Sequence, residues 1–207
     1  MLDQHTTIDA FLEATAARQP TPGGGAVAAL SAAMAAALAE MVLAYSIGKR
    51  DLAAHDAQLN ESRAEFTRAR QLLLGFMAED QAAYTALTAA RKLPPQSSGR
   101  DEMIAAALHA CLSVPQAVAA TALAMLELCQ ALPAKVSKYL LSDLAIAADL
   151  SMTALRCALY NIRVNLPDLP SAQQQAAVEQ AARQMLQRGE TIIQRLSPEI
   201  WRRAQNP

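Results

Sequence analysis

Two aspartates fall within otherwise apolar helical patterns, where a carboxylate could transfer protons. Steps of seven residues pass through a stripe of large apolar side chains that one carboxylate interrupts: Leu52, Leu59, Phe66, Leu73, Asp80 and Leu87. Asp143 falls within a second stripe, which runs in steps of three and four from Val136 to Asn161. A carboxylate in apolar surroundings loses hydration, so its pKa rises and it can act as a general acid or base near neutral pH. We predict Asp80 and Asp143 as catalytic residues; an ion pair at Asp80 and a helix start at Asp143 are the structural alternatives.

A run of three glycines precedes the most apolar segment of the chain. The turn reads Pro20-Thr21-Pro22-Gly23-Gly24-Gly25 and leads directly into a helical pattern. Unpaired N–H groups at the start of a helix suit an anion or a closely approaching planar ligand. A tight turn into a closely packed helix explains the same residues without a ligand. The Gly-Lys-Ser/Thr of a phosphate-binding loop does not follow, so a nucleotide-binding loop is not supported.

Two further pairs of polar residues are candidates for ligand binding. Lys49 and Arg50 follow the apolar segment and could bind an acidic part of a substrate, or could compensate the dipole at a helix C-terminus. Asn161 and Asn165 lie one turn apart and offer paired amide donors and acceptors on one helix face. Asn165 could equally end its helix, because asparagine is a weak helix former.

These residues must be positioned by helices, because no segment alternates with a period of two and Gly and Pro fall between long helical stretches. We predict an all-α fold, a compact bundle of long and largely apolar helices in a single domain over residues 1–207. The expected helices cover residues 7–17, 26–47, 51–90, 98–132, 134–164 and 171–196. Residues 26–47 are apolar on every face and predict a buried central helix, with a membrane span as the rival interpretation.

The amino-acid composition favours a partner chain and argues against a nucleic-acid partner. The chain has 207 residues, of which 53% are hydrophobic and 18% charged, against roughly 25% charged in a typical soluble domain. Apolar surface is therefore expected to be buried against a partner chain. Eighteen Lys and Arg against 19 Asp and Glu, without a basic block, argue against nucleic-acid binding.

The cysteines and histidines of the chain indicate its cellular compartment and whether it has a metal site. The first twenty residues lack the pattern of a secretory signal, and three widely spaced cysteines in apolar stretches predict buried, reduced thiols in a cytoplasmic protein: Cys111, Cys129 and Cys157. The three histidines stand alone, without the spacing of a zinc site. We expect no metal and no membrane association.

Several motifs together resemble the cyclodeaminase/cyclohydrolase family of folate enzymes, which includes formimidoyltetrahydrofolate cyclodeaminases and methenyltetrahydrofolate cyclohydrolases. The most specific motif is the proline-glycine turn followed by an alanine-rich helix. Weaker matches follow in the expected order over most of the chain: Ile47-Gly48-Lys49, Glu79-Asp80, Leu93-Pro94, Val114-Pro115, Ser142-Asp143-Leu144 and Asn161-Ile162-Arg163-Val164-Asn165-Leu166.

The resemblance implies an all-helical homodimer, formimidoyltetrahydrofolate cyclodeaminase-like, that binds a tetrahydrofolate derivative as its substrate in a cleft near the subunit interface. It implies a site in which the glycine turn approaches the folate, two basic residues face its glutamate, two asparagines orient the ring system and two aspartates transfer protons. In the order of these roles, the residues are Pro22, Gly23, Gly24 and Gly25; Lys49 and Arg50; Asn161 and Asn165; Asp80 and Asp143.

Two reactions fit this site. A cyclohydrolase adds water to the cationic methenyl carbon, and a cyclodeaminase closes the ring on the formimino carbon and releases ammonia. The chain departs from the family after Arg50, where Asp51-Leu52 replaces a basic residue and a tyrosine, and before Ser142, where a Gly-Asn element is missing. The alternative is a divergent, non-catalytic helical dimer that binds a folate-like ligand or a partner protein.

Overall fold

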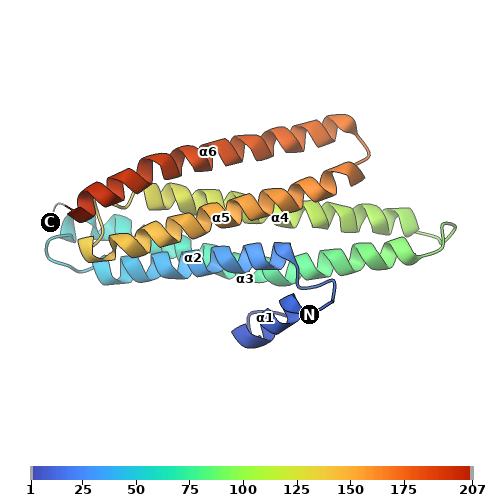
Figure 1. The fold of residues 1–207 in the computed structure, drawn as a ribbon, viewed down its shortest axis with the longest axis horizontal. Coiled ribbons are helices and arrows are strands. Elements are labelled where there is room, and N and C mark those ends of the chain that lie inside the picture. The colour runs from blue at the N-terminus through green and yellow to red at the C-terminus, as the bar shows by residue number, and fades with distance from the viewer. Residues whose placement is uncertain (1, 206–207) are drawn as a thin grey trace.

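Helices account for all the regular structure in the computed structural model, which describes residues 2–205 (Figure 1). Six α-helices follow one another along the chain: α1 Ile8–Ala16, α2 Gly24–Ser46, α3 Asp56–Lys92, α4 Arg100–Gln130, α5 Leu141–Asn165 and α6 Ala172–Gln205. Three single-turn 3₁₀ helices lie between them: η1 Ala53–His55, η2 Lys138–Leu140 and η3 Leu166–Asp168. The predicted all-α fold is confirmed.

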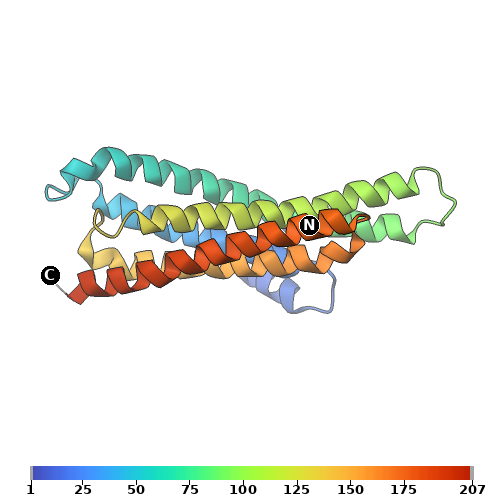
Figure 2. The ribbon, with the colours of Figure 1, turned by 90° about the horizontal axis from the view of Figure 1, so that it is seen from above.

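Four of the helices form the body of an elongated bundle. Helix α2 packs against α3 and α5, and α4 packs against the same two helices from the opposite side. Helix α6 lies along α4 and α5 on the outside, and α1 lies apart from the long helices near the start of α2 (Figures 1 and 2). Helices α3 and α4 are longer than α2 and α5 and extend past the start of α2 and the end of α5 at one end of the bundle (Figure 1).

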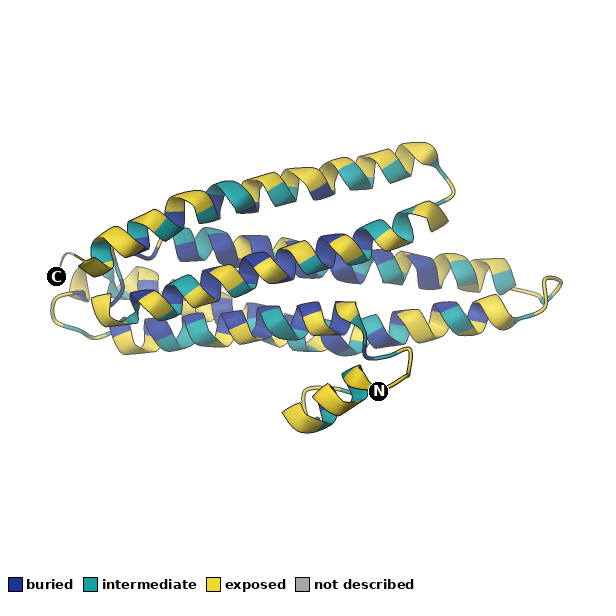
Figure 3. Cartoon of the chain, in the orientation of Figure 1, coloured by how far each residue is buried: buried dark blue, intermediate teal, exposed yellow. Residues whose placement is uncertain are grey.

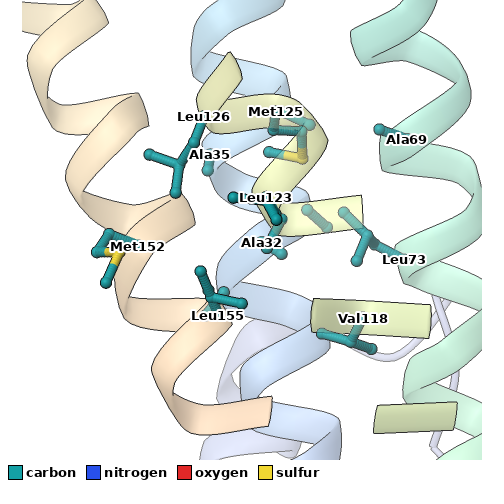
Figure 4. Close-up of a cluster of buried hydrophobic side chains, with 14 of the residues drawn as sticks. Ala32, Ala35, Ala69, Leu73, Val118, Leu123, Met125, Leu126, Met152 and Leu155 are labelled. Atoms are coloured by element: carbon teal, nitrogen blue, oxygen red, sulfur yellow. The ribbon is translucent and has the colours of Figure 1, made fainter. Parts of the chain in front are cut away.

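The core depends on the small side chains of α2. Eight of its alanines are buried, which lets neighbouring backbones approach closely, and large side chains from three other helices fill the space around them. Around Ala32 and Ala35 these come from α3, α4 and α5: Leu73, Leu126 and Leu155 (Figure 4). Buried residues face the interior of the bundle, whereas the outer side of α6 is exposed (Figure 3). The predicted seam on α3 is confirmed, because Leu59, Phe66 and Leu73 are fully buried.

Helices α2 and α4 are long and apolar enough to cross a membrane by length and composition alone. Both belong to the body of the bundle, where 56% of the most apolar window of α2 and 39% of that of α4 are buried. A core helix meets the same criterion, so these two helices are weak evidence for a membrane span.

Helix starts differ from the sequence prediction in three places. Helix α5 begins at Leu141 rather than at residue 134, because a turn after Pro133 and the 3₁₀ helix η2 precede it. Helix α3 begins at Asp56, after η1. Helix α4 begins at Arg100 rather than at residue 98, and Gly99 precedes it with φ +74°, a left-handed conformation that glycine adopts without strain.

Thr7 caps the start of α1, since its Oγ1 accepts a hydrogen bond from the Ala10 N–H at 3.2 Å.

Candidate functional site

A cavity of about 400 Å³ opens where the glycine turn meets the far end of α5. This volume lies in the range of small-molecule sites. Its walls come from the turn before α2, one face of α3, Cys111 of α4, the last turn of α5 and η3. The lining residues are Pro20, Thr21, Gly23, Gly24, Gly25, Asp80, Tyr84, Leu87, Arg91, Cys111, Asn161, Val164, Asn165 and Asp168.

Missing side chains at two glycines bring polar groups of α3 and α5 against the start of α2. A Cβ built on Gly25 would lie 1.9 Å from Asp80 Oδ1, so the carboxylate fills the place of a side chain. On the next residue, a Cβ on Gly24 would lie 3.5 Å from Asn161 Oδ1. Asp80 and Asn161 thus approach the start of α2 from opposite sides.

Asp80 is half-buried, and two effects act on its pKa in opposite directions. Burial raises the pKa of the carboxyl group above its ordinary value, and a hydrogen bond from the Ala26 backbone N–H lowers it by a smaller amount. The net direction is upward. A carboxyl group with a raised pKa exchanges protons closer to neutral pH than an exposed aspartate does, as acid–base chemistry requires.

The two asparagines use their amide groups differently. Asn161 Nδ2 donates one hydrogen bond, to Cys157 O at 2.9 Å. Asn165 Nδ2 donates two, to Cys111 O at 3.1 Å and to Asn161 O at 2.9 Å, so both of its hydrogens are engaged. Asn165 therefore ties α5 to α4, and its remaining capacity toward a ligand is as an acceptor.

An ion pair closes the other end of the cavity. Arg91 Nη2 lies 2.7 Å from Asp168 Oδ2, and the two side chains are 46% and 39% exposed. Neither residue was among the predicted site residues. Steps of four, three and four from Asp80 lead through Tyr84 and Leu87 to Arg91, so helical spacing on α3 was a usable signal for Arg91. The position of Asp168 in η3 had no such signal.

The cysteines differ from the prediction of three buried thiols. Cys129 is buried, and burial raises the pKa of its thiol to about 12. Cys111 and Cys157 are only half-buried, and Cys111 lines the cavity. Burial and the nearby Asp80 carboxylate raise the pKa of the Cys111 thiol, which favours the protonated form.

Three of the predicted site residues lie at the opposite end of the bundle. Lys49 follows the C-terminus of α2, and its Nζ donates to Ser137 Oγ at 2.7 Å and lies 5.9 Å from the centre of the Tyr139 ring. Arg50 is exposed beside it. Asp143 is in the first turn of α5, eighteen residues before Asn161, which corresponds to about 27 Å along the helix.

One chain therefore brings together only part of the predicted site. Six predicted residues line the cavity: Gly23, Gly24, Gly25, Asp80, Asn161 and Asn165. Pro22 is buried in the turn beside them. Lys49, Arg50 and Asp143 do not line this cavity in the single chain. Within residues 2–205 no three His, Cys, Asp or Glu side chains are grouped to hold a metal ion.

Fold and cavity define a class: a helical-bundle protein with a half-buried carboxylate in a cavity at the start of a glycine-initiated helix. The particular family follows from comparison with known proteins. The model of the formiminotransferase-cyclodeaminase family matches residues 7–184, and the chain belongs to this family, as its motifs predicted.

Relatives of two kinds are similar to the chain. A methenyltetrahydrofolate cyclohydrolase of Methylorubrum extorquens is 33% identical over 167 residues, which cover 79% of this chain and 80% of that protein. A formimidoyltransferase-cyclodeaminase of Sus scrofa is 32% identical over 191 residues, which cover 90% of this chain and 35% of that protein. The chain thus spans about a third of the length of the latter relative.

The fold matches a solved structure over almost its whole length. The formiminotetrahydrofolate cyclodeaminase of Thermotoga maritima superposes with a TM-score of 0.81 at 25% sequence identity, covering 97% of this chain and 96% of that one. The predicted fold, an all-α bundle like that of formimidoyltetrahydrofolate cyclodeaminase, is confirmed.

Proposed function

We propose that this chain is a folate-dependent one-carbon enzyme that acts on the carbon between N5 and N10 of tetrahydrofolate, as a methenyltetrahydrofolate cyclohydrolase. The observation that carries the proposal is the Asp80 carboxylate, half-buried against the start of α2 in a cavity of suitable size. The relative of Methylorubrum extorquens, similar over four fifths of each chain, supports this choice of reaction.

The first step adds water to the cationic methenyl carbon. Ionised Asp80 takes one proton from the attacking water while the water oxygen bonds to the carbon, which gives a neutral tetrahedral carbon that carries a hydroxyl group. The raised pKa of Asp80 makes it a stronger base than an exposed aspartate, and the backbone N–H of Ala26 holds the carboxylate in place.

The second step opens the ring. One carbon–nitrogen bond breaks, the nitrogen keeps the electron pair and takes the proton from Asp80, and the hydroxyl group loses its proton to solvent. The product carries a formyl group on the other nitrogen, and the reaction as a whole consumes one water and releases one proton. Asn161 and Asn165 orient the pterin, whose N–H groups suit their amide oxygens as acceptors.

Cyclodeaminase chemistry is the second candidate, favoured by the superposition on the Thermotoga maritima enzyme. There the nitrogen that does not carry the formimino group attacks the formimino carbon, and its proton moves to the imino nitrogen, so that a tetrahedral carbon forms between N5 and N10. Protonated Asp80 then gives its proton to the amino group on this carbon, the carbon–nitrogen bond breaks, and ammonia leaves the cationic methenyl product. One site can serve both reactions because both pass through a tetrahedral carbon at the same place.

The functional unit that we propose is a homodimer formed through α2. Six apolar side chains, in steps of three and four, run along one side of α2: Val27, Leu30, Met34, Leu38, Met41 and Tyr45. We call them the α2 stripe. Val27, Met34 and Tyr45 are exposed, whereas Leu30, Leu38 and Met41 are partly buried and pack against the core. Met34 and Tyr45 are 50% and 65% exposed, and no charged residue interrupts the stripe. A second copy of the chain can cover this apolar face, because a two-fold interface buries the same patch on both subunits.

A two-fold axis through the middle of α2 would pair the two copies of this helix antiparallel. The start of one α2 then lies beside the end of the other, so the partner's Lys49 and Arg50 approach the glycine turn. This arrangement unites residues that one chain keeps at opposite ends, and it places the basic pair near the anionic tail of the folate.

A spectroscopic assay of methenyltetrahydrofolate hydrolysis tests the function, with wild type, Asp80→Asn and the exposed-site control Asp149→Asn. Wild type and Asp149→Asn are expected to hydrolyse the substrate, and Asp80→Asn to lose about 10²- to 10⁴-fold in kcat. Ammonia release from formimidoyltetrahydrofolate tests the second candidate in the same samples. Folate binding without turnover of either substrate would support the non-catalytic alternative. A chain that does not bind folate and converts neither substrate would overturn the proposal.

A further inference from the structure

The wall that α3 contributes to the cavity changes its chemistry along its length. Asp80, Tyr84, Leu87 and Arg91 lie on one face of the helix, because they follow steps of four, three and four. A carboxylate stands at one end, an aromatic and an aliphatic side chain in the middle and a guanidinium at the other end. Asp80 and Arg91 are about 16 Å apart along the helix axis.

Arg91 is the one basic side chain among the described residues that line the cavity. The other lining charges are the carboxylates of Asp80 and Asp168, and Asp168 pairs with Arg91 at 2.7 Å. Both members of the pair are about two fifths exposed, and an ion pair in such a position contributes little to stability. Replacement of the Asp168 carboxylate by another carboxylate at Arg91 therefore costs little free energy.

The order of groups along this wall matches the order of groups in the substrate that the proposed function requires. From its reacting carbon, on the side away from the pterin, a methenyltetrahydrofolate continues through an aminobenzoyl ring to a glutamate with an α-carboxylate. With the reacting carbon at Asp80, the ring lies along Tyr84 and Leu87 and the acid extends toward Arg91. A guanidinium can bind a carboxylate with two parallel hydrogen bonds, which fixes the orientation of the tail.

We propose that Arg91 binds the α-carboxylate of the first glutamate of the folate substrate, and that Asp168 holds the guanidinium at the cavity until the substrate replaces it. The inference rests on the proposed function and assigns Arg91 a role in substrate specificity. It leaves the basic pair of the partner subunit for glutamates further along the tail.

Two substrates that differ only in the glutamate test this role. The KM and kcat for methenyltetrahydrofolate and for methenyltetrahydropteroate, which lacks the glutamate, are measured for wild type, Arg91→Gln and Arg91→Lys. The matched control is Arg68→Gln, which removes an exposed ion pair with Glu65 on the same helix. Arg91→Gln should raise KM for the folate on the order of 10- to 100-fold, the loss expected for charged hydrogen bonds, with kcat nearly unchanged. KM for the pteroate should stay at the wild-type value.

Intermediate and negative outcomes are also informative. Arg91→Lys keeps the positive charge but loses the planar guanidinium that donates two parallel hydrogen bonds. Its KM for the folate should therefore fall between those of wild type and Arg91→Gln. Equal changes for both substrates would mean that Arg91 is structural, and no change, or a similar change in Arg68→Gln, would also overturn the inference. If wild type converts neither substrate, the proposed function fails; if it converts both with equal KM, only the role of Arg91 fails.

Discussion

Asp80 Oδ1 lies 1.9 Å from the point where a Cβ on Gly25 would stand, and Asp80 Cγ lies 2.4 Å from it. Carboxylate and side chain cannot share this space. Gly25 therefore has a steric role in addition to any exposure of backbone N–H groups: its missing side chain lets a carboxylate of α3 reach the first turn of α2. The glycine run and the aspartate in the apolar seam are two parts of one arrangement.

Gly25→Ala is expected to displace Asp80 and to lower kcat/KM by about 100-fold, the loss that a misplacement of roughly 1 Å can cause. The activity assay gives the loss, and circular dichroism checks that the helices remain. The control is Gly75→Ala on α3, where the nearest atom to the new Cβ, Glu79 Oε1, is 3.9 Å away. It should keep full activity and gain about 0.5–1 kcal/mol in stability, as alanine replaces glycine in a helix. Full activity in Gly25→Ala would contradict the steric role.

Asp80→Asn is expected to stabilise the fold at neutral pH while it removes activity. Burial raises the pKa of Asp80, so the folded chain binds this proton more tightly than the unfolded chain, and stability falls as pH rises from the ordinary value of 3.8 through the raised pKa. The amide carries no charge and avoids this loss. For a chain of this size, each kcal/mol gained raises Tm by about 2–4 °C.

The sign of this effect is checked by thermal unfolding across pH. The Tm advantage of Asp80→Asn over wild type should be full above the raised pKa and should shrink as the pH falls toward 3.8. Asp149→Asn, at an exposed position of α5, serves as the control for the change of side chain. An advantage that grows on acidification would mean that the Asp80 carboxylate stabilises the fold.

The sequence predicts which face of a helix a site residue lies on, but not its position along the bundle axis. Helical periodicity identifies the face on which a residue lies, and it placed Asp80 inward on α3 together with the buried Leu73 and Leu87. Periodicity does not give the level of a residue along the bundle axis relative to another helix. It therefore could not show that Asp143 and Asp80 lie at different ends of the bundle, because that depends on how α3 and α5 are offset.

The ion pair of Arg91 and Asp168 lay beyond sequence reasoning for a related reason. The two residues are distant in sequence, and their contact depends on the 3₁₀ turn that follows α5. The helix starts that differ from prediction are also set by tertiary contacts: the Ser137 N–H donates to Ser46 Oγ at 2.9 Å, which fixes the segment before α5 against the end of α2. The alanine-rich composition of α2, by contrast, was sufficient to place this helix in the core.

Met34→Glu is expected to convert the proposed dimer to a monomer. Met34 lies near the middle of the α2 stripe, so a two-fold axis there would bring two carboxylates together in an apolar interface. Light scattering at micromolar concentration should give 22.0 kDa for the variant and twice that mass for wild type. Met103→Glu makes the same change at a 51% exposed methionine of α4 and should leave the dimer intact. A wild-type mass of 22.0 kDa would overturn the dimer.

The antiparallel arrangement of α2 predicts that each site takes Asp80 from one chain and Lys49 from the other. Asp80→Asn and Lys49→Ala homodimers would then each carry two damaged sites. In the mixed dimer, one site receives both substitutions and the other receives neither. The mixed dimer, purified through two different tags and assayed at low substrate concentration, should recover about half of the wild-type activity, one site of two. If Asp80 and Lys49 act within the same chain, each site of the mixed dimer keeps one damaged residue, and its activity stays near the mean of the two homodimers. A fully active Lys49→Ala homodimer would instead remove Lys49 from the site, whichever way the chains pair.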